Sequence, residues 1–294
     1  MNRAERPLFA PASLLVAAAI WGVIWYPYRV LEEAGLSGSA STVLTYLVAM
    51  GLGLSLLRRV TLWPRPYIGM LLLVALVAGA TNLAYVLAVI GGEIMRVMLL
   101  FYLAPLWTLL FARLILEETA GRLGLAILLL SLAGAFVMLG GFSGNLPLPG
   151  NAAEWLGLAS GMGFALVNVL SRRLREVPGI TRSLWMFAGV VLVAALPVGL
   201  SPAPFAALAP DPGLVAWIVL TGMGLVLATF TVQYGLARVP ANRAIVLLLS
   251  ELVVAALASW WLAGETMRAQ EWLGGAMIVA ATLLSGRMER NEPA

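Results

Sequence analysis

The chain has 294 residues, of which 62% are hydrophobic and only 11% are charged, and its formal net charge is +4. A soluble protein of this length needs more charged side chains to cover its surface, so the composition predicts an integral membrane protein. All 18 basic residues are arginine, and they lie in short clusters between apolar runs. Such clusters are typical of membrane topology signals, and they argue against nucleic-acid binding.

Two residue types that carry much of protein chemistry are absent from the sequence. The chain contains no cysteine, which excludes disulfides and thiol chemistry, and no histidine. Without histidine there is no Ser-His-Asp triad, no histidine-ligated metal site and no zinc-protease helix motif. We therefore expect a protein that is not an enzyme and that has no metal and no cofactor.

Ten apolar segments are long enough to cross a membrane, for which a helix needs roughly 20 residues. In chain order they cover residues 11–29, 39–57, 66–90, 94–116, 121–141, 153–171, 183–200, 213–237, 242–263 and 270–286. The first follows Arg3 and Arg6, as in a signal peptide, but its apolar run continues to Tyr28 and indicates a spanning helix. The sequence thus predicts an all-α integral membrane protein with ten transmembrane helices.

The arginines indicate how these helices are oriented. An even number of spans places both termini on the same side of the membrane. With both termini in the cytoplasm, 15 of the 18 arginines are cytoplasmic, and only Arg29, Arg96 and Arg268 lie outside. Because short cytoplasmic loops carry an excess of positive charge, we expect a multi-pass protein with both termini cytoplasmic.

The chain also contains an internal repeat. Residues 96–119 align without gaps on residues 243–266, at an offset of 147 residues, which is half of the chain. The offset matches the Arg that begins each stretch and the Glu-Thr pair that ends it. Because each half holds an odd number of spans, the halves enter the membrane from opposite sides. Residues 1–147 and 148–294 are therefore predicted to be five-helix inverted-topology repeats of one membrane domain, an arrangement typical of secondary transporters.

Short motifs near the ends of the two repeats are similar to those of a known family. Residues 264–266 read Gly-Glu-Thr, and Glu118 and Thr119 stand at the equivalent place in the first half. With its ten helices in two repeats, the chain resembles the EamA-type branch of the drug/metabolite transporter (DMT) superfamily over essentially its whole length. Its aromatic-rich first helix and the Ala-Pro-Leu-Trp stretch at 104–107 most resemble bacterial exporters of aromatic and other amino acids.

This resemblance implies a function and a location. It implies a secondary transporter that exports amino acids, aromatic ones included, and related small metabolites across the bacterial inner membrane. The expected partners are these small molecules, the lipid bilayer and, if transport is coupled, protons. The alternatives are a broad drug/metabolite efflux carrier with other substrates, or a membrane receptor or sensor.

Glu251 is the most informative single residue. It lies in an apolar run, about nine residues into the predicted helix 242–263, which places it near the middle of the bilayer. A carboxylate there is costly unless it faces a cavity or a partner, and Arg243 is about 12 Å away along the same helix. We expect Glu251, with Ser250 beside it, to line a cavity and bind a substrate ammonium group or a proton. The alternative is a Glu that ties two helices together.

Aromatic residues on two helices are expected to form the cavity wall. Tyr102 and Trp107 lie in the fourth helix at a depth similar to that of Glu251, and Trp21 lies near the middle of the first, where tryptophan is unusual. Pro105 leaves the Phe101 carbonyl without its helical donor. It is either a hinge or an ordinary tolerated proline.

Polar side chains on three further helices are candidate substrate ligands. They are Asn82 and Tyr85 on the third helix, Asn168 on the sixth, and Gln233 and Tyr234 on the eighth. Polar side chains in lipid seek partners, so each is either an interhelical contact or a hydrogen-bonding group for a zwitterionic substrate. The sequence leaves both possibilities open.

Overall fold

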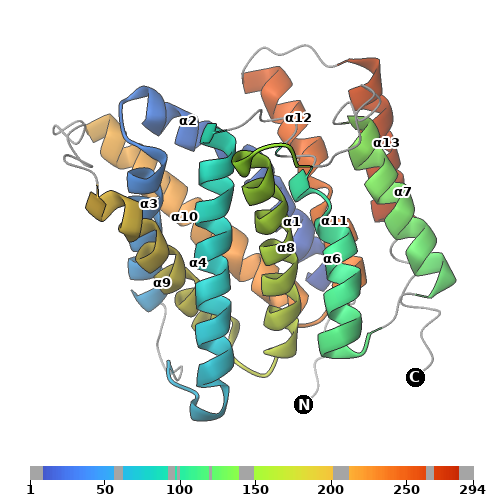
Figure 1. Ribbon diagram of the computed structural model, residues 1–294, viewed down its shortest axis with the longest axis horizontal. Helices are drawn as coiled ribbons and strands as arrows, with labels where there is room; N and C mark the ends of the chain where they lie inside the picture. Colours follow the sequence, from blue (N-terminus) through green and yellow to red (C-terminus); the bar gives the residue numbers. More distant parts are fainter. Residues whose placement is uncertain are drawn as a thin grey trace.

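A computed structural model of the protein describes residues 9–55, 62–91, 97, 100–118, 121–138, 149–200, 212–262 and 268–284. Every regular element in these ranges is a helix (Figure 1). Several residues named above lie outside the described part of the chain: Arg3, Arg6, Arg96, Thr119 and residues 264–266.

The helices follow the order of the predicted segments. They are α1 (Phe9–Val23), α2 (Trp25–Glu33), α3 (Gly38–Ser55), η1 (Arg65–Tyr67), α4 (Ile68–Gly91), α6 (Ala104–Phe111), η2 (Ala112–Leu116), α7 (Arg122–Met138), α8 (Ala152–Arg173), α9 (Gly179–Leu200), α10 (Pro212–Leu236), α11 (Ala241–Leu248), α12 (Glu251–Leu262) and α13 (Ala269–Leu284). In the described part of the chain, six helical stretches are long and apolar enough to cross a membrane, and four shorter apolar ones coincide with the remaining segments. The all-α prediction is therefore confirmed for these residues.

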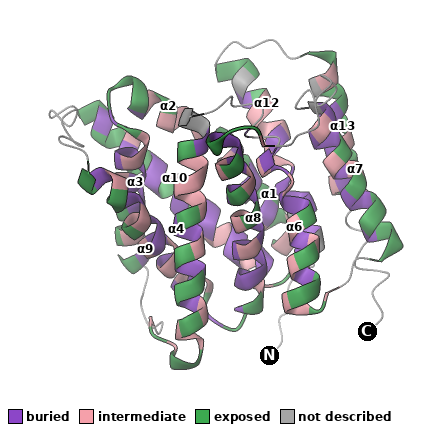
Figure 2. Cartoon of the chain, viewed as in Figure 1, coloured by how far each residue is buried: buried purple, intermediate pink, exposed green. Residues whose placement is uncertain are grey.

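Large apolar side chains cover the outside of the helical bundle. Leu76 on α4, Leu196 on α9 and Leu227 on α10 are each more than half exposed. Figure 2 shows exposed residues along the outer faces of helices such as α4 and α7. In water a large exposed apolar surface is prone to association, whereas the bilayer interior is itself apolar. This surface is that of a protein embedded in lipid.

The first predicted segment differs from the expected single helix, because it is divided at Ile24. α1 ends at Val23 and α2 begins at Trp25. Pro27 has no N–H to donate to the Val23 carbonyl, and its ring crowds that carbonyl. The proline therefore breaks the helix one turn before its own position.

The fourth and ninth segments are broken at matching places. The fourth turns at Tyr102 and Leu103, just before α6, and the ninth turns at Leu249 and Ser250, between α11 and α12. The repeat offset of 147 residues aligns these two turns with each other. The prediction of a continuous ninth helix with Glu251 in its interior is wrong, since Glu251 is the first residue of α12.

The first break has a local cause in the sequence, whereas the second has none that is specific to it. Pro105, in the first turn of α6, accounts for the first break because it removes a helical donor. The second break has Leu252 in place of proline. There the Ser250 hydroxyl donates to the Leu247 carbonyl at 2.7 Å, and the Ser250 N–H lies 3.2 Å from the same oxygen. Ser131 in α7 and Ser160 in α8 make the same bond within continuous helices, so this contact accompanies the second break and does not by itself cause it.

The principal helix contacts join the first half of the chain to the second. α4 packs on α8 and α9, α10 packs on α1 and α3, and α7 packs on α13. α3 also packs on α9, α1 on α12, and α6 on α8. By the 147-residue offset, the first-half helices α1, α3, α4, α6 and α7 correspond to α8, α9, α10, α12 and α13. Exchanging each helix for its counterpart gives the same set of packed pairs. This pattern supports the repeat that the sequence predicts.

Candidate functional site

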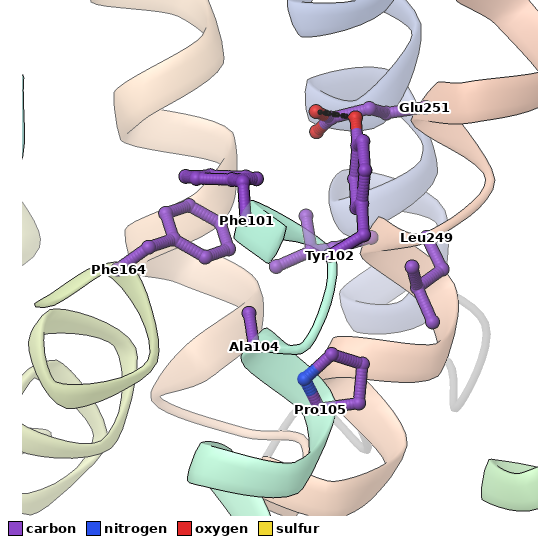
Figure 3. A pocket seen from close by; sticks show the side chains of 8 residues that line it. Phe101, Tyr102, Ala104, Pro105, Phe164, Leu249 and Glu251 are labelled. Atoms are coloured by element: carbon purple, nitrogen blue, oxygen red, sulfur yellow. Dashed lines mark hydrogen bonds between the residues drawn. The ribbon is translucent and has the colours of Figure 1, made fainter. Parts of the chain in front are cut away.

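The two helix breaks face each other in the middle of the bundle. Tyr102, at the first break, donates its hydroxyl hydrogen bond to Oε1 of Glu251, at the second, over 2.8 Å (Figure 3). Tyr102 is buried, with 7% of its surface exposed, and Glu251 is half-buried. A hydrogen bond to a carboxylate is stronger than one between neutral groups, so this contact couples the two halves at their least regular points.

A pocket lies between the two breaks. It has an empty volume of about 250 Å³, part of which is its open mouth. Its lining consists of Phe101, Tyr102, Ala104, Pro105, Phe164, Leu248, Leu249 and Glu251. The space inside the pocket that a water-sized molecule can occupy is about 10 Å³, room for about one water, so the pocket in this arrangement of the helices is too small for a metabolite. Seven of its eight lining residues come from the broken segments, and Phe164 comes from α8.

Glycines on neighbouring helices bring the broken segments close. A Cβ on Gly22 of α1 would lie 2.8 Å from the Glu251 carbonyl oxygen, too close for any other residue. A Cβ on Gly161 of α8 would collide in the same way with the carbonyl of Phe101. Glycine is needed at both positions because the backbones themselves are in contact there. Each break is therefore held against a helix of the opposite half, α1 in one case and α8 in the other.

Aromatic rings form a continuous wall beside the pocket. The Phe101 ring lies 5.4 Å from that of Tyr102, 5.5 Å from that of Phe164 and 5.3 Å from that of Tyr85, centroid to centroid. Rings at these distances in edge-on and tilted arrangements attract one another beyond the burial of their area. The wall presents apolar surface and ring faces next to the carboxylate of Glu251.

Three of the predicted site residues line the pocket and two lie next to it. Tyr102, Pro105 and Glu251 are part of the lining, and Tyr85 contacts it through Phe101. Ser250 lies beside the pocket, but its hydroxyl bonds to the Leu247 carbonyl. These residues stay candidates for substrate contact.

The other predicted residues lie outside the pocket lining. Trp21 packs half-buried against two apolar clusters, centred on α9 and α10 and on α1 and α11. Trp107 stacks on Phe111, with ring centroids 6.3 Å apart. Asn82 and Asn168 each keep a buried side-chain atom, Oδ1 and Nδ2 respectively, for which the described residues provide no hydrogen-bond partner. None of these four side chains reaches the pocket as the helices now stand.

Gln233 and Tyr234 contact other residues near the end of α10, and the Gln233 Oε1 is buried without a hydrogen-bond partner among the described residues. The Gln233 amide nitrogen lies 3.2 Å from the Ser171 hydroxyl, which fits the interhelical role that was one of the two expectations. Tyr234 lies beneath the guanidinium of Arg238, whose Cζ is 3.9 Å from the ring centroid. These contacts tie α8, α10 and the turn after α10 together.

Sequence reasoning missed Phe101, Ala104, Phe164, Leu248 and Leu249 as lining residues. Ala104 and Leu249 had a signal, since they are the repeat counterparts of Glu251 and Tyr102. Phe164 had none, because nothing in an apolar helix shows which of its side chains faces a break in another helix. The lining therefore depends on how the helices pack.

Glu118, at the end of the fourth segment, takes part in a second contact between the halves. Its Oε1 accepts a hydrogen bond from Arg172 Nε at 2.6 Å, and its Oε2 accepts one from the Ala241 N–H at 2.9 Å. Arg172 also reaches the Leu236 carbonyl at 3.3 Å. One carboxylate thus joins the last turn of α8 and the first residue of α11. The resemblance drew attention to Glu118, and the contacts show what its carboxylate binds.

Comparison with known proteins agrees with this architecture. Residues 151–287 match the EamA-like transporter family. A protein of Archaeoglobus fulgidus described as an uncharacterized transporter is 29% identical over 210 residues, which cover 70% of this chain and 72% of the relative. A crystal structure of another protein superposes with a TM-score of 0.77 over 97% of this chain and 99% of that chain, at 19% identity, so the two share a fold. The second half of the chain is therefore similar to the EamA-like transporter family, and most of the chain is similar to a protein described as an uncharacterized transporter.

Proposed function

We propose that the protein is a secondary transporter that exports amino acids, aromatic ones included, and related small metabolites across the inner membrane. In this proposal residues 1–147 and 148–294 are inverted-topology repeats, both termini are cytoplasmic, and the substrate passes between the repeats by alternating access. The observation that carries it is the hydrogen bond of 2.8 Å between Tyr102 and Glu251, which bridges two helix breaks at a pocket.

The packing of the broken segments suits alternating access. Both parts of the ninth segment pack against α1 and α13, and α11 packs in addition against α6 and α7. In the described part of the chain, only the α11 part therefore packs against α6 of the broken fourth segment. Breaks in the hydrogen-bonding ladder are where a helix bends at least cost, so Pro105 and Ser250 are the proposed hinges.

Glu251 supplies the proposed binding group. A half-buried carboxylate in a lipid-embedded bundle is stabilised by a cation, and both a substrate ammonium group and a proton meet that need. Either would compete with Tyr102 for the carboxylate. Loss of the Tyr102 hydrogen bond would then free the two breaks to separate, which links binding to movement.

The test is transport by the purified protein in liposomes. Radiolabelled amino acids, including phenylalanine and tryptophan, are supplied with and without a pH gradient. Saturable uptake that is accelerated by unlabelled substrate on the opposite side is expected of a carrier. Linear, unsaturable flux would indicate a pore, and no flux of any amino acid would contradict the proposal.

A further inference from the structure

We propose that the pocket at the helix breaks binds organic cations, namely primary amines with an aromatic or apolar body, in preference to zwitterionic amino acids. The inference rests on the proposed function, since it takes this pocket to lie on the transport path. Amines of this kind are decarboxylated relatives of amino acids. The preference follows from which polar groups the pocket offers and which it lacks.

The charges of the pocket are of one sign. Its eight lining residues include one carboxylate, Glu251, and no basic side chain. Arg243, the arginine on the same segment, lies eight residues before Glu251 on the far side of the break. A zwitterion brought here would place its ammonium group beside Glu251 but would leave its carboxylate with no cation among the lining residues. An unpaired charge taken out of water is costly.

Backbone donors do not compensate for the missing cation. Helix N-termini often bind carboxylates through their free N–H groups, and α12 begins at the pocket. Here, however, the N–H groups of Leu252, Val253 and Val254 are already bonded to the carbonyls of Leu249 and Ser250 at 3.1–3.2 Å. These three N–H groups are therefore not free to bind an anion.

At the start of α6, Pro105 and Leu106 likewise have no free N–H group for an anion. Pro105 has no N–H, and the Leu106 N–H is bonded to the Leu103 carbonyl at 2.9 Å. The Tyr102 hydroxyl already donates to Glu251. Each of these donors is thus either absent or occupied. The Tyr102 hydroxyl, if an ammonium group displaces it, is a neutral donor, so a substrate carboxylate meets no cationic partner among the lining residues.

The acceptors and rings suit an ammonium group with an apolar body. An amine brings three N–H donors, which can replace the Tyr102 hydroxyl at Glu251 and neutralise the carboxylate. Phe101 and Phe164, with centroids 5.5 Å apart, provide ring faces and apolar area for the rest of the molecule. Cations over aromatic faces gain attraction, most strongly where water is excluded. The pocket therefore offers a monocation both a carboxylate for its ammonium group and aromatic surface for its apolar body.

The experiment compares ligands that differ only by a carboxylate. Phenethylamine and L-phenylalanine, and tyramine and L-tyrosine, are titrated into the purified full-length protein by calorimetry and then used in liposome flux assays. Each amine is expected to bind about tenfold or more tightly than its amino acid, because an uncompensated buried charge is costly. Glu251→Gln should weaken amine binding by a similar factor, whereas Glu33→Gln, at an exposed pair with Arg29, should not.

Each outcome decides the question. Equal or tighter binding of the amino acids overturns the amine preference and leaves the proposed amino-acid export standing. Failure of both ligand classes to bind or to cross overturns the proposed function as well. The wild-type comparison does not depend on any variant folding. Phe164→Leu, which keeps apolar volume but removes a ring, should reduce amine binding several-fold, and unchanged binding would count against the aromatic wall.

Discussion

Arg172 Nε lies 2.6 Å from Glu118 Oε1, and this ion pair joins the last turn of α8 to the end of the fourth spanning segment. The two side chains are 11% and 24% exposed. The other oxygen of Glu118 accepts the Ala241 N–H at the start of α11. A carboxylate held in this way between two helix ends restrains the two halves of the chain on the side where α6 and α11 pack together.

Replacing Glu118 by Gln should destabilise this side of the bundle. The variant keeps the size of the side chain but loses the charge that Arg172 and the Ala241 N–H share, and a hydrogen bond to a charged group contributes about 1.5–3 kcal/mol. Thermal unfolding of the detergent-solubilised protein is the measurement. The matched control is Glu33→Gln at the exposed pair with Arg29, where a loss of about 0.5 kcal/mol or less is expected. Equal melting temperatures for the two variants would show that the Arg172–Glu118 ion pair does not stabilise the fold measurably.

Replacing Glu251 separates binding from structure. Glu251→Gln keeps an acceptor for the Tyr102 hydroxyl but cannot ionise, so folding should persist while transport weakens and its dependence on pH flattens. Glu251→Leu also removes the acceptor and leaves the buried Tyr102 hydroxyl unpaired, which should cost about 1–3 kcal/mol of stability. Flux from pH 5.5 to 8 and melting temperature are measured together. If both variants transport like the parent at every pH, Glu251 is not a binding group.

Replacing Trp21 by Ala should reduce stability more than it alters selectivity. Trp21 packs against two apolar clusters and does not line the pocket. Large-to-small changes at aromatic core positions cost about 3–5 kcal/mol, and a half-buried ring should fall near the lower end. The measurement is the melting temperature beside the relative rates for a panel of amino acids. If the order of preference among amino acids changed while the melting temperature did not, Trp21 would be a residue of the substrate cavity wall, contrary to this prediction.

The orientation of the chain can be tested with single cysteines, since the protein has none of its own. Arg173 is exposed at the end of α8, in an arginine cluster assigned to the cytoplasm. Arg173→Cys should react with a membrane-impermeant thiol reagent only when the cytoplasmic face is accessible. Labelling in intact cells from the outside would reverse the assignment.

The sequence by itself determined which stretches are helices in lipid, because length and hydropathy are local properties that the bilayer selects directly. It also placed Pro105 and a carboxylate at position 251 within apolar segments and predicted the repeat, since each can be read from residues close together in the chain or from one fixed offset. The sequence did not predict the second break. Ser250 bonds back to the Leu247 carbonyl, but Ser131 and Ser160 make the same bond inside continuous helices, so the serine alone does not mark the break.

The tertiary structure alone decided what Glu251 contacts. Tyr102 lies 149 residues away in the chain, and the two meet because Gly22 and Gly161 let α1 and α8 approach the broken segments closely. Phe164 and Leu248 join the lining for the same reason, whereas Trp21 and Gln233 face packed side chains instead. In an apolar bundle nearly every face of every helix is apolar, so hydropathy does not specify which faces meet. Close packing between helices makes that choice, and it depends on the shapes of side chains far apart in the sequence.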